Sequence, residues 1–243
     1  MGKSFLLVGG SSDIGLRLAT MLLDDGHGVT LLARDADRVG HLVTKGAVLV
    51  QGDALDEQTV QAAVAAASEA GENGMSGMAH LVGSIALRPP HATKLEDFQS
   101  VLETNLVSAF LALKTAGKAM LKLGQGRMVF TSSVAGSYGL TNHEAIAAAK
   151  GGIEAMVRSA ASTYAGRGLR VNAVAPGLTE TRLGATVLRS DAIREASVGM
   201  IPLKRINEPD EIAQSMHWLL TSAPDNLTGQ IIHLDGGMSA LRG

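Results

Sequence analysis

The segment 131–156 places a serine and a lysine at a spacing that suits chemistry on a carbonyl group. Its sequence is TSSVAGSYGLTNHEAIAAAKGGIEAM, with Ser133 near the start and Lys150 in an alanine-rich stretch of helical character. Ile146 stands thirteen positions after Ser133 and four before Lys150, so Ile146 and Lys150 fall on one face of the expected helix. A hydroxyl and an amine can act on a carbonyl oxygen, but isoleucine has no proton to transfer.

A glycine-rich turn near the N-terminus predicts a second kind of chemistry, the binding of a diphosphate. The apolar run 5–8 leads into GGSSDIG at 9–15 and then into an amphipathic helix. A buried strand that ends in such a turn directs the N–H groups of the next helix toward a pyrophosphate. The position of the turn after the first strand predicts dinucleotide binding at Gly9, Ser11, Ser12, Ile14 and Gly15.

Elements that alternate along the chain must position these residues. Runs with strand character lie at 5–8, 29–33, 47–51, 80–82, 127–132, 169–175 and 230–234, and helical patterns lie at 14–24, 57–70, 105–123, 144–165 and 209–221. Continuous apolar runs such as LLVGG are typical of strands covered on both faces. The alternation predicts one α/β domain over 1–243, a doubly wound, parallel seven-stranded sheet with helices on both faces, which is the Rossmann fold.

Composition narrows the class of protein. The 243 residues are 46% hydrophobic, with 21 basic and 23 acidic side chains and a net charge of −2. This balance gives no electrostatic reason to expect nucleic acid or a membrane surface as a partner. The absence of cysteine excludes disulfides, thiol catalysis and a cysteine-based zinc site, and we expect no metal site. The short apolar run at 5–8 resembles no signal peptide or membrane span, so we expect a cytoplasmic protein.

The segment 131–156 resembles the catalytic region of the short-chain dehydrogenase/reductase family. The family motif is Ser, thirteen residues, Tyr, then x-x-x-Lys, and only the tyrosine is replaced here, by Ile146. The resemblance implies that Ser133 polarises a carbonyl, that Lys150 holds the nicotinamide ribose, and that Asn105 supports a proton relay. Asn105 can also be read as a helix N-cap, and Lys150 as a surface residue.

Several groups are candidates to replace the missing acid. His143 is three positions before Ile146 and shares its helix face, and Tyr138 lies in the preceding loop, which would line a substrate pocket. Glu144 is the weakest candidate, because 141–144 (TNHE) reads as a capping box that gives it a structural task. A water relay through Lys150, or no acid at all, is the remaining alternative.

The choice of dinucleotide depends on charge after the second strand. Ala33 and Arg34 stand where an NAD site would have an acid, and an arginine there accommodates the 2′-phosphate of NADP. We therefore predict NADP(H) rather than NAD(H), although Arg34 could instead pair with Asp35 or Asp37 in solvent. Asp53 matches the family's acid near the adenine ring, or it caps the helix that follows.

Two motifs depart from the family pattern, and a third matches it. Val8 and Asp13 replace the Thr and middle Gly of the family's T-G-x-x-x-G-x-G motif; Asp13 could cap the helix or repel a diphosphate. GSIA at 83–86 replaces Asn-Asn-Ala-Gly, and Gly83 still lets the backbone approach the cofactor. The later turn matches, which implies nicotinamide contacts from Pro176, Gly177, Thr179 and Thr181.

These observations leave three functions open. The first is an NADP(H)-dependent oxidoreductase with an atypical active site, acting on a small carbonyl, alcohol or activated alkene. The second is an inactive NADP(H)-binding regulatory protein, and the third is a non-redox isomerase, dehydratase or cyclase. The resemblance also implies a substrate lid at about 180–205, apolar in composition here, and a homotetramer or homodimer joined in part by the last strand.

Overall fold

The computed structural model describes residues 2–241 and has one parallel sheet at its centre. The strands are β1 (Ser4–Val8), β2 (Gly28–Ala33), β3 (Val48–Gln51), β4 (Gly77–His80), β5 (Gly126–Thr131), β6 (Leu169–Pro176) and β7 (Ile231–Leu234). Their order across the sheet is β3-β2-β1-β4-β5-β6-β7, and every neighbouring pair is parallel. The predicted seven-stranded doubly wound fold is confirmed.

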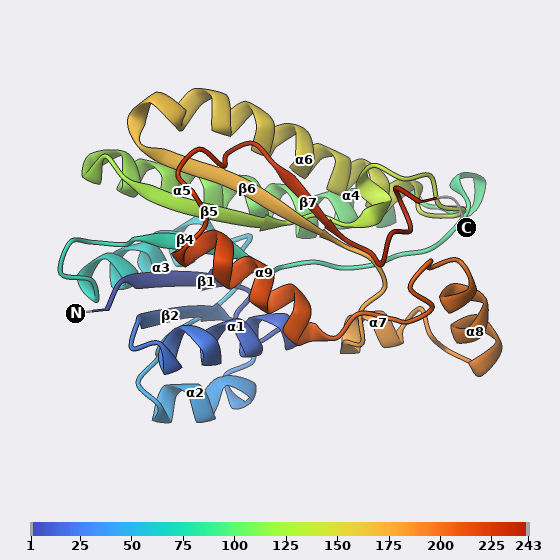
Figure 1. The fold of residues 1–243 in the computed structure, drawn as a ribbon, viewed down its shortest axis with the longest axis horizontal. Helices are drawn as coiled ribbons and strands as arrows, with labels where there is room; N and C mark the ends of the chain where they lie inside the picture. The colour runs from blue at the N-terminus through green and yellow to red at the C-terminus, as the bar shows by residue number, and fades with distance from the viewer. Residues whose placement is uncertain (1, 242–243) are drawn as a thin grey trace.

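Helices cover both faces of this sheet, and Figure 1 shows the three layers. The helices are α1 (Asp13–Asp24), α2 (Gly40–Thr44), α3 (Glu57–Glu69), α4 (Leu95–Leu102), α5 (Ser108–Leu123), α6 (Glu144–Tyr164), α7 (Arg182–Ala185), α8 (Asp191–Gly199) and α9 (Pro209–Thr221). One apolar cluster joins the sheet to α3, α5 and α6, and a second joins it to α1, α2 and α9. No helix within residues 2–241 is long and apolar enough to cross a membrane.

The chain reverses its direction of travel across the sheet at β1. The strands β2 and β3 lie on one side of β1, and β4 lies on the other. In open parallel sheets a ligand binds in the crevice that forms at such a reversal, outside the carboxyl ends of the strands. The fold therefore brings together the loops that follow β1, β2, β4, β5 and β6.

Two expected elements differ from the structure. The fourth strand is Gly77–His80 rather than 80–82. Its sequence begins with glycine and has no continuous run of large apolar residues, yet Gly77 and Met78 pair with β5. The expected helix 105–123 is part of a longer helical run, α4 through α5, interrupted by a π-helical turn at Glu103–Val107. Asn105 lies inside this turn and is therefore not a helix N-cap. π-turns within α-helices are frequent at functional sites.

The imidazole of His80 is buried inside this frame as a neutral group. Its Nε2 lies 2.9 Å from the Ser108 hydroxyl, whose own hydrogen is donated to the Thr104 carbonyl oxygen at 2.6 Å. His80 Nε2 must therefore donate, and no group within residues 2–241 pairs with its Nδ1. Burial, with a smaller contribution from Lys150, lowers the pKa of His80 from 6.5 to about 3.

This burial predicts a specific dependence of stability on pH. Between pH 6.5 and 3 the unfolded chain binds a proton at His80 that the folded chain does not, so stability falls as pH falls through this window. The full loss is on the order of 5 kcal/mol. Replacing His80 by Gln should flatten the slope of unfolding free energy against pH, measured by urea titration from pH 7 to about 4.

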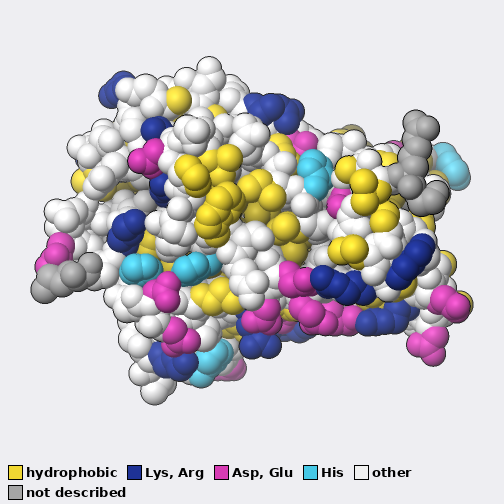
Figure 2. All heavy atoms as spheres, viewed as in Figure 1, with side chains coloured by type: hydrophobic (Ala, Val, Ile, Leu, Met, Phe, Trp, Pro, Cys, Tyr) yellow, Lys and Arg dark blue, Asp and Glu magenta, His cyan; other side chains and the backbone are white. Residues whose placement is uncertain are grey.

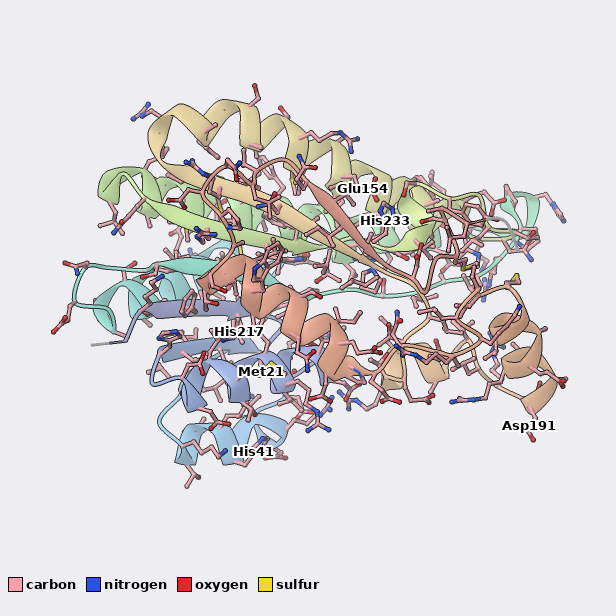
Figure 3. All side chains as sticks on the ribbon, in the orientation of Figure 1. Met21, His41, Glu154, Asp191, His217 and His233 are labelled. Carbon is pink, nitrogen blue, oxygen red and sulfur yellow. The ribbon has the colours of Figure 1, made fainter. Side chains whose placement is uncertain are left out.

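The control is His41→Gln, because His41 is exposed on α2, where Figure 3 shows it at the edge of the molecule. This variant should keep the slope of the parent protein. An unchanged slope in the His80 variant would contradict the assignment of acid sensitivity to this residue.

Candidate functional site

A cleft of about 470 Å³ opens at the carboxyl edge of the sheet, and nearly every predicted site residue lines it. The catalytic candidates Asn105, Ser133, His143 and Lys150 are all on its wall. Of the predicted dinucleotide contacts, those on the wall are Gly9, Ser11, Ser12, Ile14, Arg34, Asp53, Gly83, Pro176, Gly177, Thr179 and Thr181. Gly15 is not on the wall, and its role is in packing: a Cβ there would lie 2.9 Å from the carbonyl oxygen of Gly10.

The turn after β1 has the form of a diphosphate cradle. Gly9 has a φ of +87°, and a Cβ on it would lie 2.9 Å from the backbone nitrogen of Val82, so the turn excludes a side chain at this point. The helix α1 that follows is capped by Ser12, whose hydroxyl oxygen accepts from the N–H of Gly15 at 3.1 Å. Within residues 2–241 the N–H groups of Asp13 and Ile14 have no acceptor, so they are available to an anion. These features fit the diphosphate of a dinucleotide.

Asp13 does not cap α1, because Ser12 does. Its carboxylate instead forms an ion pair with Arg38, at 2.7 Å between Oδ1 and Nη2, and accepts a hydrogen bond from the backbone N–H of Arg182 at 2.8 Å. The expected repulsion of a diphosphate is therefore offset by a guanidinium, a partner that lies 25 residues away in the sequence.

Arg34 and Asp53 face each other where the adenosine end of a dinucleotide would lie. The Arg34 guanidinium is 3.8 Å from the Asp53 carboxylate, and both side chains are largely exposed. Arg34 therefore pairs with Asp53 rather than with Asp35 or Asp37. The helix α3 is capped by Asp56, so Asp53 is free of that task and its other oxygen accepts from the N–H of Leu55 at 2.9 Å.

Lys150 is the buried cation of the cleft. Its side chain reaches from α6 to the end of β5, where Nζ donates to the carbonyl oxygen of Thr131 at 2.8 Å. The residue is only 6% exposed, and no carboxylate within residues 2–241 pairs with it. Burial lowers the pKa of Lys150 from 10.5 to about 8. A substantial fraction of Lys150 is therefore a neutral amine at mildly alkaline pH, and the surface reading of this residue is wrong.

Asn105 and Gly83 fix the wall opposite Lys150. The Asn105 amide donates to the carbonyl oxygen of Val101 and to the hydroxyl of Ser84, and its oxygen accepts from the N–H of Ser84 at 3.3 Å. A Cβ at Gly83 would lie 3.1 Å from Asn105 Oδ1 and 3.6 Å from Lys150 Nζ. The glycine that replaces the first polar residue of the family turn thus leaves room for Asn105 and Lys150.

Ser133 keeps a hydroxyl hydrogen for a ligand. It ends the connection from β5 and caps a short 3-10 turn, where its oxygen accepts from the N–H of Ala135 at 3.2 Å. Within residues 2–241 no group accepts its hydrogen. Thr179 and Thr181, across the cleft, already donate to carbonyl oxygens of their own loop but retain oxygens that can accept.

Ile146 lies against an apolar cluster beside the cleft. It is 3% exposed and packs with Val101, Ala135, Ala145 and Ala149. One helical turn separates it from Lys150, so this apolar surface adjoins the buried amine. No polar group of the residue itself reaches the cleft, and the wall is hydrophobic where the family motif has a phenol.

The positions and hydrogen bonds of His143, Tyr138 and Glu144 show whether each could act as the proton donor. His143 lines the cleft, and its Nδ1 lies 2.7 Å from the carbonyl oxygen of Thr141, which can only accept. In neutral His143 the single N–H is therefore used, and Nε2 is an acceptor rather than the hydrogen-bond donor that the sequence suggested. Tyr138 is not on the cleft wall; it lines an adjoining outer hollow. Glu144 is exposed, and the predicted capping box is wrong because α6 begins after His143 without a side-chain cap.

The segment from α7 to α8 lines one side of the cleft, where the resemblance implies a substrate lid at about 180–205. Of the apolar side chains of this segment, Leu183, Val187 and Met200 lie on the cleft wall. Figure 3 places Asp191 at the outer end of α8, away from the sheet. An ion pair between Arg194 and Glu180 holds α8 to the chain before α7, and Figure 2 shows acidic and basic side chains side by side over this region.

The wall also contains residues that the sequence did not single out. Met238 and Leu140 add apolar surface near His143, and Leu178 follows Gly177. No motif marks these positions; they are brought to the cleft by loops whose path only the fold defines. On the substrate side, beyond Ser133, the wall is apolar except for His143 and Ser197.

Comparison with known proteins agrees with this architecture. A family model described as enoyl-(acyl carrier protein) reductase matches residues 9–239. The chain belongs to the short-chain dehydrogenase/reductase family. It is 33% identical to cis-4-hydroxycyclohexanecarboxylate dehydrogenase of Sinomonas cyclohexanicum, covering 99% of this chain and 100% of that protein. It is 31% identical to the 3-oxoacyl-[acyl-carrier-protein] reductase MabA of Mycobacterium tuberculosis, covering 98% of this chain and 93% of that one.

Solved structures of the family superimpose on the whole chain. A short-chain type dehydrogenase/reductase from Mycobacterium ulcerans has a TM-score of 0.92 at 26% identity, covering 99% of this chain and 91% of that one. A candidate NAD(P)-dependent gluconate 5-dehydrogenase from Beutenbergia cavernae, solved with NADP at low occupancy, has a TM-score of 0.91 at 27% identity, covering 99% and 98%. The family is one of oxidoreductases with nicotinamide cofactors, which agrees with the cradle after β1.

Proposed function

We propose that this protein is an NADP(H)-dependent oxidoreductase that interconverts a small apolar carbonyl compound and its alcohol. The observation that carries the proposal is the convergence of Ser133, Lys150 and the turn after β1 on one cleft. The apolar wall beyond Ser133 favours a substrate with an apolar body, in keeping with relatives named for a hydroxycyclohexanecarboxylate and for a 3-oxoacyl substrate. An activated alkene stays an alternative substrate, because a hydrogen bond from Ser133 to a carbonyl oxygen would serve either reduction. We propose a cytoplasmic homotetramer or homodimer, with β7 at the sheet edge as one contact.

The residues of the cleft divide the chemistry among them. A bound nicotinamide supplies or accepts the hydride. Ser133 donates a hydrogen bond to the carbonyl oxygen, since its hydrogen is not otherwise used. Lys150 provides the proton, directly or through an ordered water, because its ammonium has a pKa of about 8 and keeps two hydrogens beyond the one given to Thr131. The α7–α8 segment acts as the substrate lid and excludes water from these groups.

Ile146 and the lowered pKa of Lys150 are connected in this proposal. A buried apolar side chain one turn before Lys150 withholds solvent from the amine, and desolvation disfavours its charged form. A proton donor is most effective when its pKa lies near the operating pH. Replacing the tyrosine by isoleucine thus removes one acid and brings the neighbouring ammonium into the useful range.

A pH profile tests the role of Lys150. The rate of carbonyl reduction, measured as kcat/KM for the carbonyl substrate at saturating NADPH, should fall as pH rises through about 8, because the ammonium is lost there. Lys150→Met should lower kcat by a factor of about 100 or more and remove this limb. His143→Gln is the matched variant: it should retain the limb, and a larger loss in it than in Lys150→Met would transfer the proton-donor role to His143. Tight NADPH binding with no turnover of any carbonyl would contradict the proposed enzyme.

The preference for NADPH depends on Arg34. A charge-assisted contact to a 2′-phosphate is worth about 1.5–3 kcal/mol, so Arg34→Gln should raise KM for NADPH about tenfold or more. KM for NADH should change less than about twofold, since the 2′-hydroxyl offers no such charge. Arg17→Gln is the control, because Arg17 lies on α1 and pairs with Asp210 away from the cleft wall. Equal effects on both cofactors would contradict this role for Arg34.

Restoring the family acid gives a third test. Ile146→Tyr should increase kcat about tenfold or more and shift the alkaline limb, because a phenol beside Lys150 offers a better placed acid. Ile146→Phe matches the tyrosine in volume but lacks the hydroxyl, so it isolates the effect of the added proton. Similar rates for the two variants would show that the phenol does not reach the substrate, and Ile146 would then only shape the pocket.

A further inference from the structure

Asp13 joins three parts of the cleft that are far apart in the sequence. It is the first residue of α1, in the turn after β1, and its two carboxylate oxygens have different partners. Oδ1 pairs with the Arg38 guanidinium, which follows β2, and Oδ2 accepts from the backbone N–H of Arg182, the first residue of α7. The Asp13 and Arg38 side chains are only 23% and 20% exposed, so solvent screens this arrangement less than a surface pair.

Asp13 provides an acceptor for the backbone N–H of Arg182, which has none within α7. The first N–H groups of a helix have no acceptor within it. In α7 the Thr181 hydroxyl serves the N–H of Gly184, and Asp13 serves that of Arg182 across 169 residues of sequence. The start of the α7–α8 segment is thereby fastened to the cofactor turn. Thr179 and Thr181, which precede this helix, are held by the same contact.

The ion pair to Arg38 controls the charge that this arrangement brings into the cleft. Asp13 lines the cleft beside the unpaired N–H groups that suit a diphosphate. A carboxylate without a counterion would repel that ligand. The guanidinium of Arg38 pairs with Asp13 through Nη2, and its buried Nη1 has no other partner within residues 2–241. Arg38 is not on the cleft wall, so it neutralises Asp13 without contacting a ligand there.

We propose that Asp13 is a positioning residue that fixes the entrance of the α7–α8 segment before the dinucleotide binds, while Arg38 neutralises it. The carboxylate is not needed to cap α1, since Ser12 does so. Its fastening of α7 presents Thr179 and Thr181 to the ligand without a loop-ordering cost at the moment of binding. This inference rests on the proposed function only in taking the ligand to be NADP(H).

The fastening is tested first without any cofactor. Hydrogen exchange of a peptide covering 180–188 should be about tenfold faster in Asp13→Ala, because the Arg182 N–H loses its acceptor. Asp13→Asn retains an acceptor oxygen and should stay within about threefold of the parent, which is the rescue expected of a conservative variant. Asp97→Asn, which removes the surface ion pair with Arg88, is the control and should leave this peptide unchanged. Unchanged exchange in Asp13→Ala would overturn the proposal.

The charge role is tested separately by NADPH binding, measured by calorimetry. Arg38→Met keeps the stem of the side chain and leaves the Asp13 carboxylate unneutralised. It should leave exchange of 180–188 nearly unchanged but raise the dissociation constant for NADPH about tenfold. Asp13→Ala should change both quantities, so the pair of variants separates fastening from neutralisation. Equal NADPH affinity in Arg38→Met and the parent would refute the charge role.

The proposed function and the Asp13–Arg182 contact are tested by different measurements. If the parent binds no NADPH, the proposed function fails while the exchange result still decides the fastening. If Asp13→Ala does not fold, Asp13→Asn and Arg38→Met still differ in one measurement: both should leave exchange of 180–188 nearly unchanged, but only Arg38→Met should lose NADPH affinity. Faster exchange in Asp13→Asn of more than about threefold would count against the acceptor role.

Discussion

The covering of the sheet on both faces is the constraint on which the rest of the structure depends. Two apolar clusters, one with α3, α5 and α6 and one with α1, α2 and α9, cover most of the sheet and leave few polar side chains along the strands. Polar chemistry is therefore restricted to the strand ends, where carbonyl groups and loops are no longer used by the ladder. Lys150 shows this directly, since its buried amine is held by the carbonyl oxygen of Thr131, the last residue of β5.

This constraint explains how much could be predicted. Continuous apolar runs and helical periods follow from burial, so the seven strands and the doubly wound fold could be predicted from the sequence, whereas cleft residues such as Ser133 and Thr179 were expected from the family resemblance. The π-helical turn at Asn105 could not, because it arises from tertiary contacts between the Asn105 amide and the Ser84 turn. The partners of Asp13 could not be foreseen either, since they lie 25 and 169 residues away.

The two ion pairs of the cleft differ in their exposure to solvent. At the adenosine end, Arg34 and Asp53 are exposed and can exchange their mutual contact for a ligand. Asp13 and Arg38 are mostly buried and have fixed partners. An exposed charge can therefore select a ligand by its own charge, whereas a buried pair sets the geometry in which selection takes place.

Ile146 is fully compatible with the helix that carries Lys150. Ile146 joins an apolar cluster that any large hydrophobic side chain could complete, so the helix and the position of Lys150 do not depend on a phenol. A phenol and a lysine would share a proton between two groups, whereas here burial lowers the pKa of Lys150, and His143 Nδ1 is engaged by the carbonyl oxygen of Thr141. In the proposed mechanism the Lys150 ammonium gives the proton in carbonyl reduction, so the neutral Lys150 amine receives it in alcohol oxidation. Both directions of the reaction would then use one residue, as they use the single tyrosine of the family motif.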